Sequence, residues 1–184
     1  MKQNYNLDKP MVMVLAGPPC SGKSTAGAWL ATTLPGIHLH VDAILTAIMP
    51  RSDRCLRDRR LAYEIAARSI KPVLDRGLSA VLDCTYSRKE YRQQVVDHVP
   101  SDVPLVVIEF LVSVDVALER FRNRKVHHAI DLTPAIVAEK VASYPYGAGA
   151  VTMNGETSGD EIRARILRSL DGNLDRGKWV NGGV

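Results

Sequence analysis

The sequence predicts an α/β domain built on a parallel β-sheet. Apolar stretches of strand length alternate with amphipathic stretches of helix length, which is the order of βα units joined by right-handed crossovers. Several apolar stretches are nearly continuous, as is typical of parallel strands covered by helices on both faces. The 184 residues, 46% of them hydrophobic, suit a single core, which we expect at residues 1–172, followed by a flexible tail at 173–184.

The first strand and the first helix flank a glycine-rich loop. An apolar strand is expected at residues 11–16 and a helix at 25–34, and the sequence between them fits G-x-x-x-x-G-K-[ST] at every fixed position. Such a loop binds phosphate, because its backbone N–H groups and the helix N-terminus surround an anion. Lys23 is expected to reach the β- and γ-phosphates of a nucleoside triphosphate, and Ser24 to ligand Mg²⁺. The predicted nucleotide-binding residues here are Gly17, Pro18, Pro19, Cys20, Ser21, Gly22, Lys23, Ser24 and Thr25.

The next elements are a half-exposed strand and two helices. Apolar and polar residues alternate over residues 37–41, which predicts an edge strand that ends at Asp42. A short helix is expected at residues 43–49. A long helix, with one apolar face and a kink near Pro72, is expected at about residues 56–76.

The rest of the chain continues the alternation of strands and helices. Strands are expected at residues 79–83 and 105–112, and a short fifth strand at 150–153. Helices are expected at residues 89–99, 114–124, 134–142 and 159–170.

Two aspartates follow strands of the predicted sheet. Ligands gather at the carboxyl ends of parallel strands, so Asp42, Asp83 and the glycine loop are expected at one edge. Asp83 ends an apolar strand, as a Walker-B carboxylate does, and would hold Mg²⁺ opposite Ser24. Asp42 would accept the proton of an acceptor hydroxyl, with His40 beside it. Either aspartate can instead cap the following helix, and His40 can be a solvated edge residue.

Two arginines near the end of the predicted helix at residues 114–124 are candidates for charge stabilisation. Arg120 and Arg124 lie four residues apart on one side of the helix, so both can point at the same anion. They would bind the nucleotide phosphates and stabilise the transferred phosphoryl group. A solvated basic helix face is the alternative for the same pattern.

Over about residues 11–170 the chain resembles the small P-loop kinases of the nucleoside-monophosphate-kinase-like fold, in particular the zeta-toxin and polynucleotide-kinase relatives often labelled AAA-type ATPase-like. The resemblance rests on the phosphate loop, on Asp42, and on the sequences VLDCT at 81–85 and LERFRNR at 118–124. It implies a three-layer sandwich with a five-stranded parallel sheet in the order 2-3-1-4-5, ATP with Mg²⁺ on the loop, and a helical lid at about residues 120–143.

The resemblance is weaker where the acceptor should bind. The family's third strand usually ends Asp-Ala-Thr-Asn with an arginine further on, whereas here Cys84 and Tyr86 replace Ala and Asn, and Arg92 matches the arginine. Leu45 stands where the family often has another arginine. The predicted acceptor-binding residues are Asp42, His40, Arg51, Thr85, Tyr86 and Arg92.

Together these features predict an ATP-dependent kinase that phosphorylates a hydroxyl of a small molecule, such as a nucleoside, a sugar or an antibiotic. Lys23, Asp42, Arg120 and Arg124 would be its catalytic residues. One alternative is a polynucleotide 5′-hydroxyl or RNA-modifying kinase, which the mild net charge of +4 and the 5% aromatic content disfavour without excluding nucleic acid as a partner. The other is a nucleotide switch, although the chain has neither an Asn-Lys-x-Asp motif nor Asp-x-x-Gly after the third strand.

Composition bears on disulfide bonds, zinc binding and cellular location. The three cysteines have no C-x-x-C spacing, so neither a disulfide framework nor a zinc site is indicated. The apolar runs are too short to span a membrane, and residues 1–10 are too polar for a signal peptide, so a cytoplasmic location is expected. No feature of the sequence indicates a particular oligomeric state.

Overall fold

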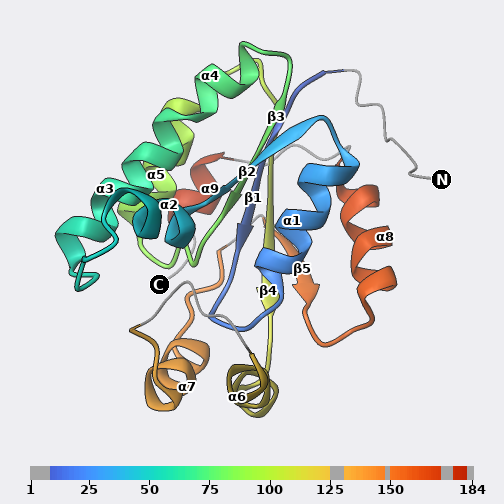
Figure 1. The fold of residues 1–184 in the computed structure, drawn as a ribbon. Helices are drawn as coiled ribbons and strands as arrows, with labels where there is room; N and C mark the ends of the chain where they lie inside the picture. The colour runs from blue at the N-terminus through green and yellow to red at the C-terminus, as the bar shows by residue number, and fades with distance from the viewer. Residues whose placement is uncertain (1–8, 125–130, 148–149, 171–175, 182–184) are drawn as a thin grey trace.

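A five-stranded parallel sheet forms the centre of the molecule, with the strand order β2-β3-β1-β4-β5 (Figure 1). The computed structural model describes residues 9–124, 131–147, 150–170 and 176–181. The strands are β1 (Val12–Ala16), β2 (Gly36–His40), β3 (Ser79–Asp83), β4 (Leu105–Leu111) and β5 (Val151–Asn154). Their number, direction and order confirm the predicted fold class.

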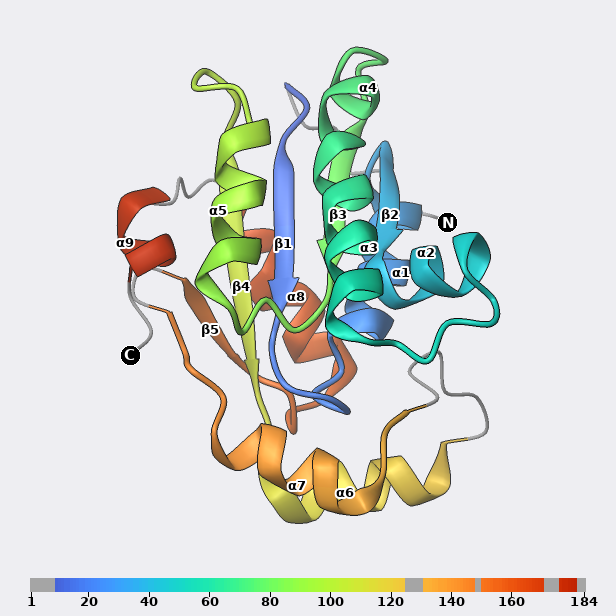
Figure 2. The same cartoon turned by 90° about the vertical axis from the view of Figure 1, so that its left-hand side faces the viewer.

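Helices cover both faces of this sheet, giving three layers (Figures 1 and 2). On one face lie α3 (Leu56–Arg68), α4 (Ile70–Leu74), α5 (Lys89–His98) and α9 (Arg176–Asn181), and on the other lie α1 (Lys23–Thr33) and α8 (Gly159–Ser169). The central strand β1 serves both cores, because Val12 and Val14 belong to the first apolar cluster whereas Met13 and Leu15 belong to the second. This alternation explains why the strand reads as a continuous apolar run.

The remaining helices lie toward the carboxyl ends of the strands. They are α2 (Val41–Ile48), which follows β2, and the pair α6 (Val114–Asn123) and α7 (Pro134–Ala142). Buried residues of the α6–α7 pair form a third apolar cluster of their own, which includes Ala117 and Val137 and reaches Cys20 of the glycine loop. None of the described helices has the length and apolar character needed to cross a bilayer.

The predicted long helix at residues 56–76 is divided in the structure. The first part, α3, ends at Arg68, and α4 begins at Ile70. Pro72 accounts for the break, because a proline has no N–H to donate and its ring crowds the carbonyl four residues earlier, which is that of Arg68.

The helix after β2 begins earlier than predicted. Its N-cap is His40, whose Nδ1 accepts a hydrogen bond from the Ala43 backbone N–H at 3.1 Å. Asp42 therefore lies in the first turn of α2 and does not act as the cap. Its side chain is left for other contacts.

The C-terminal region differs from the flexible tail predicted at residues 173–184. Arg176–Asn181 form a helix, and the Trp179 side chain is 0% exposed. Arg92 lies beside this indole, with the guanidinium carbon 5.8 Å from the ring centroid. The prediction is wrong for this segment because an aromatic side chain supplies a buried anchor within a glycine-rich stretch.

Candidate active site

The backbone of the glycine loop bends sharply, as a loop that surrounds an anion must. Three of its residues have positive φ angles, namely Gly17 at 144°, Cys20 at 61° and Gly22 at 99°. A Cβ atom on Gly17 would lie 2.8 Å from the carbonyl oxygen of Phe110, so no side chain fits there. The Lys23 side chain turns back into the loop, and its Nζ donates a hydrogen bond to the carbonyl of Pro18 at 3.0 Å. The ammonium group is thus held where the loop would surround an anion.

A cavity of about 480 Å³ adjoins this loop and has the size of a nucleotide site. It is lined by the loop, α1, the end of α6 and the segment from β5 to α8, through Cys20, Gly22, Lys23, Ser24, Thr25, Ala26, Trp29, Arg120, Asn123, Arg124, Gly155, Thr157, Gly159, Ile162 and Arg163. Arg120 joins two of these walls, because its guanidinium donates to the carbonyls of Cys20 at 3.2 Å and Gly155 at 2.8 Å. Trp29 also lines this cavity, and the Arg163 guanidinium carbon is 5.7 Å from its ring centroid.

The two predicted metal ligands both lie near one nitrogen of His40. The Nε2 atom of His40 is 3.4 Å from the Ser24 Oγ and 3.5 Å from the Asp83 Oδ2. Because Nδ1 of His40 accepts the Ala43 N–H, the ring proton lies on Nε2 and points toward these two oxygens. Ser24 and Asp83, which are 59 positions apart in the chain, are thereby brought to one place.

The Asp83 carboxylate is completely buried, and it also accepts a hydrogen bond from His38 Nε2 at 3.2 Å. Burial alone would raise the pKa of this carboxyl, but the hydrogen bond from His38 and the charge of Lys23 outweigh burial and hold the pKa below its usual value. Its second oxygen, Oδ1, has no hydrogen-bond partner among the described residues. An ionised carboxylate with an unpartnered oxygen, near the same histidine as the Ser24 hydroxyl, fits a Mg²⁺ ion, which prefers oxygen ligands.

A second, smaller cavity of about 60 Å³ opens on the other side of the loop. It is lined by Pro19, Cys20, Lys23, Ser24, His40, Asp42, Arg59, Cys84, Thr85, Arg124, Leu132 and Lys140. Four residues line both cavities, namely Cys20, Lys23, Ser24 and Arg124. Lys23, Ser24 and Arg124 therefore stand at the boundary between a nucleotide-sized space and a second space that contains Asp42.

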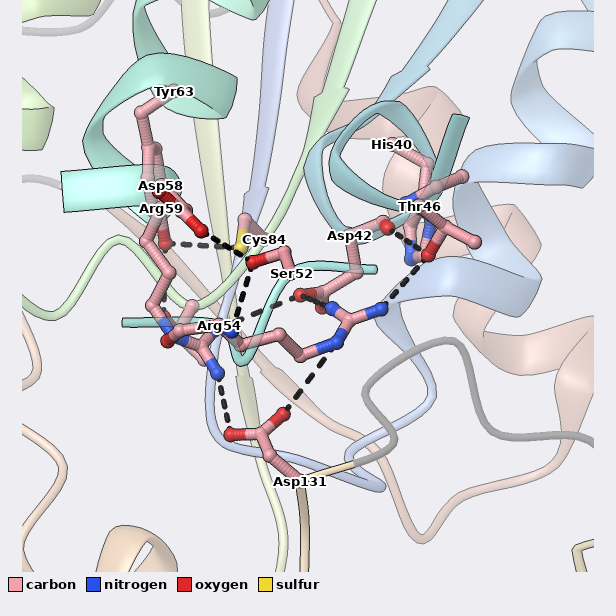
Figure 3. Close-up of polar contacts among 12 residues, drawn as sticks. His40, Asp42, Thr46, Ser52, Arg54, Asp58, Arg59, Tyr63, Cys84 and Asp131 are labelled. Atoms are coloured by element: carbon pink, nitrogen blue, oxygen red, sulfur yellow. Dashed lines mark hydrogen bonds and ion pairs between the residues drawn. The ribbon is translucent and has the colours of Figure 1, made fainter. Parts of the chain in front are cut away.

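Asp42 is held by two arginines from the segment that follows α2 (Figure 3). Its Oδ1 atom is 3.5 Å from Arg54 Nη1 and 3.8 Å from Arg59 Nη1. Both ion pairs use the same oxygen, so Oδ2 lies outside them. Arg54 is further fixed by a 2.8 Å hydrogen bond from its Nη2 to Thr46 Oγ1, and its side chain is only 4% exposed.

The same two arginines also bind an aspartate that lies just before α7. Arg59 Nη2 donates to Asp131 Oδ2 at 2.5 Å, and Arg54 Nε is 3.9 Å from Asp131 Oδ1. Two guanidinium groups and two carboxylates thus form one charge-balanced cluster, which we call the Asp42–Asp131 cluster (Figure 3). It connects α2, α3 and the start of α7, and two of its members, Asp42 and Arg59, line the second cavity.

Several predicted site residues are brought together, whereas others are not. His40, Asp42 and Thr85 line the second cavity. Tyr86 and Arg92 do not, since they are 1% and 2% exposed. The Arg92 guanidinium is used inside the protein, where it donates to the carbonyls of Tyr86 at 2.8 Å, Trp179 at 3.1 Å and Pro145 at 2.6 Å.

The assignment of Tyr86 and Arg92 to the acceptor is therefore wrong, because both side chains serve the core. Arg92 also pairs with the buried Glu109, with 3.7 Å between Nη2 and Oε1. Arg51 is exposed and does not line either cavity described above. Of the two arginines at the end of α6, Arg124 lines both cavities, whereas Arg120 lines only the nucleotide-sized one.

The sequence did not single out Arg54, Arg59, Asp131 and Lys140 as site residues. Arg54 lies in the basic stretch after α2, and this clustering of positive charge is the sequence feature that could have indicated it. The contact between Arg59 and Asp131 spans 72 positions and joins two helices whose relative placement has no local signature. Residues 125–130 of the predicted lid lie outside the described part of the chain.

Comparison with known proteins agrees with this geometry. The sequence profile of a family described as "AAA domain" matches residues 12–145, which include the glycine loop and all strands except β5. A search of curated proteins found no match.

Solved structures of similar fold include kinases and a chain of an RNA repair complex. A sugar kinase from Janibacter sp. HTCC2649 has a TM-score of 0.69 and 16% identity, covering 91% of this chain and 97% of that chain. A gluconokinase from Sinorhizobium meliloti 1021 has a TM-score of 0.68 and 19% identity, covering 88% and 92%. A chain of the Pnkp1/Rnl/Hen1 RNA repair complex has a TM-score of 0.60 and 18% identity, covering 76% of this chain and 45% of that chain. At these identities the likeness shows the small P-loop kinase fold.

Proposed function

The chain belongs to the family described as "AAA domain", and from this premise we propose that it is an ATP-dependent kinase that phosphorylates a hydroxyl group of a small molecule. One observation carries the proposal. The nucleotide-sized cavity and the cavity that contains Asp42 meet at Lys23, Ser24 and Arg124. A γ-phosphate bound at Lys23 would therefore face a second molecule that lies against Asp42.

In the proposed reaction the acceptor's hydroxyl oxygen attacks the γ-phosphorus of ATP. The bond between this phosphorus and the β–γ bridging oxygen breaks, and ADP leaves with the electron pair. The hydroxyl proton passes to Asp42 through Oδ2, the oxygen that lies outside the ion pairs with Arg54 and Arg59. Lys23 and Arg124 stabilise the charge that develops on the transferred group.

Ser24 and Asp83 would hold the magnesium ion, as their shared proximity to His40 and the unpartnered Asp83 Oδ1 support. When bound, Mg²⁺ supplies charge neutralisation and orientation of the phosphates. Arg120 has a different task in this proposal. Its two hydrogen bonds to backbone carbonyls support a role in closing the nucleotide site around ATP.

The small size of the second cavity supports a small acceptor. A polynucleotide needs a groove that admits a backbone, whereas here Arg59, which lines the cavity, is bound to Asp131 just before α7. The three cysteines are free thiols, which supports the proposed cytoplasmic location.

The proposal is tested with labelled ATP and a panel of hydroxyl compounds, scored for phosphorylated product. In the variant Asp42→Asn, kcat should fall by about 10²–10⁴-fold, because general base catalysis is lost, while the Kd of ATP stays unchanged. Asp102→Asn, at an exposed aspartate in the turn before β4, serves as the matched control and should keep full activity. Full turnover by Asp42→Asn would show that Asp42 is not the general base. Equal losses in kcat and in ATP affinity would also contradict that role.

The structural likeness to a chain of an RNA repair complex supports a second candidate function, that of a polynucleotide 5′-hydroxyl kinase. Such an enzyme would phosphorylate 5′-hydroxyl oligonucleotides with a KM that rises steeply with salt concentration. Transfer to small hydroxyl compounds with no activity on oligonucleotides would exclude this candidate.

A further inference from the structure

We propose that the acceptor carries a negatively charged oxyanion group besides its hydroxyl, and that Lys140 of α7 binds that group. This inference rests on the proposed kinase function and names the class of its acceptor. It follows from the balance of charges around the second cavity.

The side chains that line this cavity are predominantly cationic. Four of them carry a positive charge, namely Lys23, Arg59, Arg124 and Lys140, whereas Asp42 is the one carboxylate among the lining residues. Two of these cations have a task in the proposed reaction. Lys23 and Arg124 also line the nucleotide-sized cavity, so the transferred phosphoryl group engages them.

The charge of Arg59 is compensated inside the protein. Arg59 is bound to Asp131 at 2.5 Å and lies 3.8 Å from Asp42, and Arg54 completes the cluster. Within the Asp42–Asp131 cluster two positive charges meet two negative charges. The arginines and aspartates of this cluster therefore leave no net charge for an acceptor to neutralise.

Lys140 is the cation that remains. Among the described residues no hydrogen bond or ion pair of its ammonium group is found, although its side chain is only half-exposed. The one acidic residue of its own helix is Glu139, which is its sequence neighbour and therefore does not share its side of the helix. A partly buried ammonium group without a counter-charge is costly, and an anionic ligand in the cavity would supply the missing charge.

The space available limits the anionic group to a small one. A cavity of about 60 Å³ has room for about four to six water positions. A carboxylate next to a hydroxyl-bearing carbon has that size. Phosphate has the same oxyanion chemistry but is larger, and the experiment separates the two.

The test compares acceptors that differ only in charge, using labelled ATP. Two pairs test a carboxylate: D-gluconate with D-glucitol, and D-glycerate with glycerol. A third pair, D-glucose 6-phosphate with D-glucose, tests a phosphate as the anionic group. We expect kcat/KM to be at least about tenfold higher for the charged member of a pair, because charge-assisted hydrogen bonds are the strong ones. In Lys140→Gln the KM for that acceptor should rise about 10- to 100-fold, while the KM for ATP and the KM for the neutral member stay unchanged.

A binding measurement makes the inference testable without turnover. With a non-hydrolysable ATP analogue filling the phosphate loop, gluconate should raise the Tm of the wild-type protein and should fail to do so in Lys140→Gln. The control variant is Lys89→Gln, at an exposed lysine at the start of α5, which should behave as the wild type in both assays.

The outcomes distinguish the inference from the kinase function on which it rests. Transfer to neutral acceptors that is as efficient as transfer to charged ones, with no effect of Lys140→Gln, would overturn the inference and leave the kinase intact. Equal stabilisation of wild type and Lys140→Gln by gluconate and by glucose 6-phosphate would also overturn it. Lysine-dependent anion binding without transfer to any hydroxyl compound would support the anion site and count against the kinase function.

Discussion

Replacing Asp131 with asparagine should let water compete with the acceptor for the phosphoryl group. Asp131 lies just before α7, and its carboxylate is bound to Arg59 of α3 at 2.5 Å and lies 3.9 Å from Arg54. These contacts hold the start of α7, which belongs to the lid predicted at about residues 120–143, against Arg54 and Arg59. An asparagine keeps the size of the side chain but removes its charge, so the contact with both guanidinium groups weakens.

The solvent exposure of Arg59 and Asp131 limits the free energy that their contact contributes. A hydrogen bond between charged groups contributes about 1.5–3 kcal/mol when well shielded from water. The Arg59 and Asp131 side chains are 25% and 31% exposed, so solvent screening reduces this value. We take about 1–2 kcal/mol for the whole contact. Its loss lowers the ratio of closed to open lid about 5- to 30-fold.

The assay measures two rates on the same sample. ATP hydrolysis without acceptor reports access of water, and formation of phosphorylated acceptor reports productive transfer. In Asp131→Asn the ratio of hydrolysis to transfer should rise about 5- to 30-fold, because a lid that opens more often admits water. Glu139→Gln, an exposed change on α7 itself, is the matched control and should leave the ratio unchanged.

A double-mutant cycle with Arg59→Gln separates the contact from other effects of either change. The two variants should show a coupling energy of about 1 kcal/mol or more in the hydrolysis-to-transfer ratio, because they remove the same interaction. An unchanged ratio in Asp131→Asn, or additive effects in the cycle, would refute the link between this ion pair and the exclusion of water.

Two further predictions concern stability and thiol chemistry. Trp179→Ala should lower the free energy of unfolding by about 3–5 kcal/mol in urea titrations, because it removes a fully buried indole beside Arg92, whereas a truly flexible tail would show no change. Burial raises the pKa of Cys84 to about 12 from the ordinary 9.0, so its reactive thiolate is about 10³-fold scarcer at pH 8 and the native protein should resist alkylation there. Mass spectrometry of alkylated native and unfolded protein measures the labelling of this cysteine. Labelling as rapid in the native protein as in the unfolded one would contradict the burial.

The phosphate side of the site was predictable because it is encoded locally. The residues that bend the loop, place the ammonium group and start α1 follow one another in the chain from Gly17 to Ser24, and their spacing is fixed by the chemistry of phosphate binding. Asp83 was found by its place at the end of an apolar strand, and in the structure its carboxylate and the Ser24 hydroxyl both lie near Nε2 of His40.

The acceptor side could be predicted only in part, because its residues meet through long-range packing. Asp42 and Thr85 follow strands, and the sheet topology alone places them at one edge. Arg92 was misassigned because an arginine normally seeks water or a ligand, and a fully buried arginine paired with Glu109 has no sequence signature. Asp131 and Lys140 were missed for the opposite reason, since single charged residues on a helical pair look the same whether they face solvent or a cavity.

This division of the site has a consequence for how specificity is set. The nucleotide-sized cavity and the acceptor cavity have only four lining residues in common, and each of them belongs to the glycine loop, to α1 or to the end of α6. The residues that line only the second cavity include some from three other places, namely the segment from β2 to α3, the end of β3, and the stretch from Leu132 to Lys140. Because the Asp42–Asp131 cluster joins the first of these places to the start of the last, a change of acceptor must keep the cluster balanced, whereas a change at Lys140 alters the charge of the cavity alone. Substitutions at Lys140 are therefore expected to shift acceptor preference without loss of ATP binding, and substitutions within the cluster to impair transfer for every acceptor.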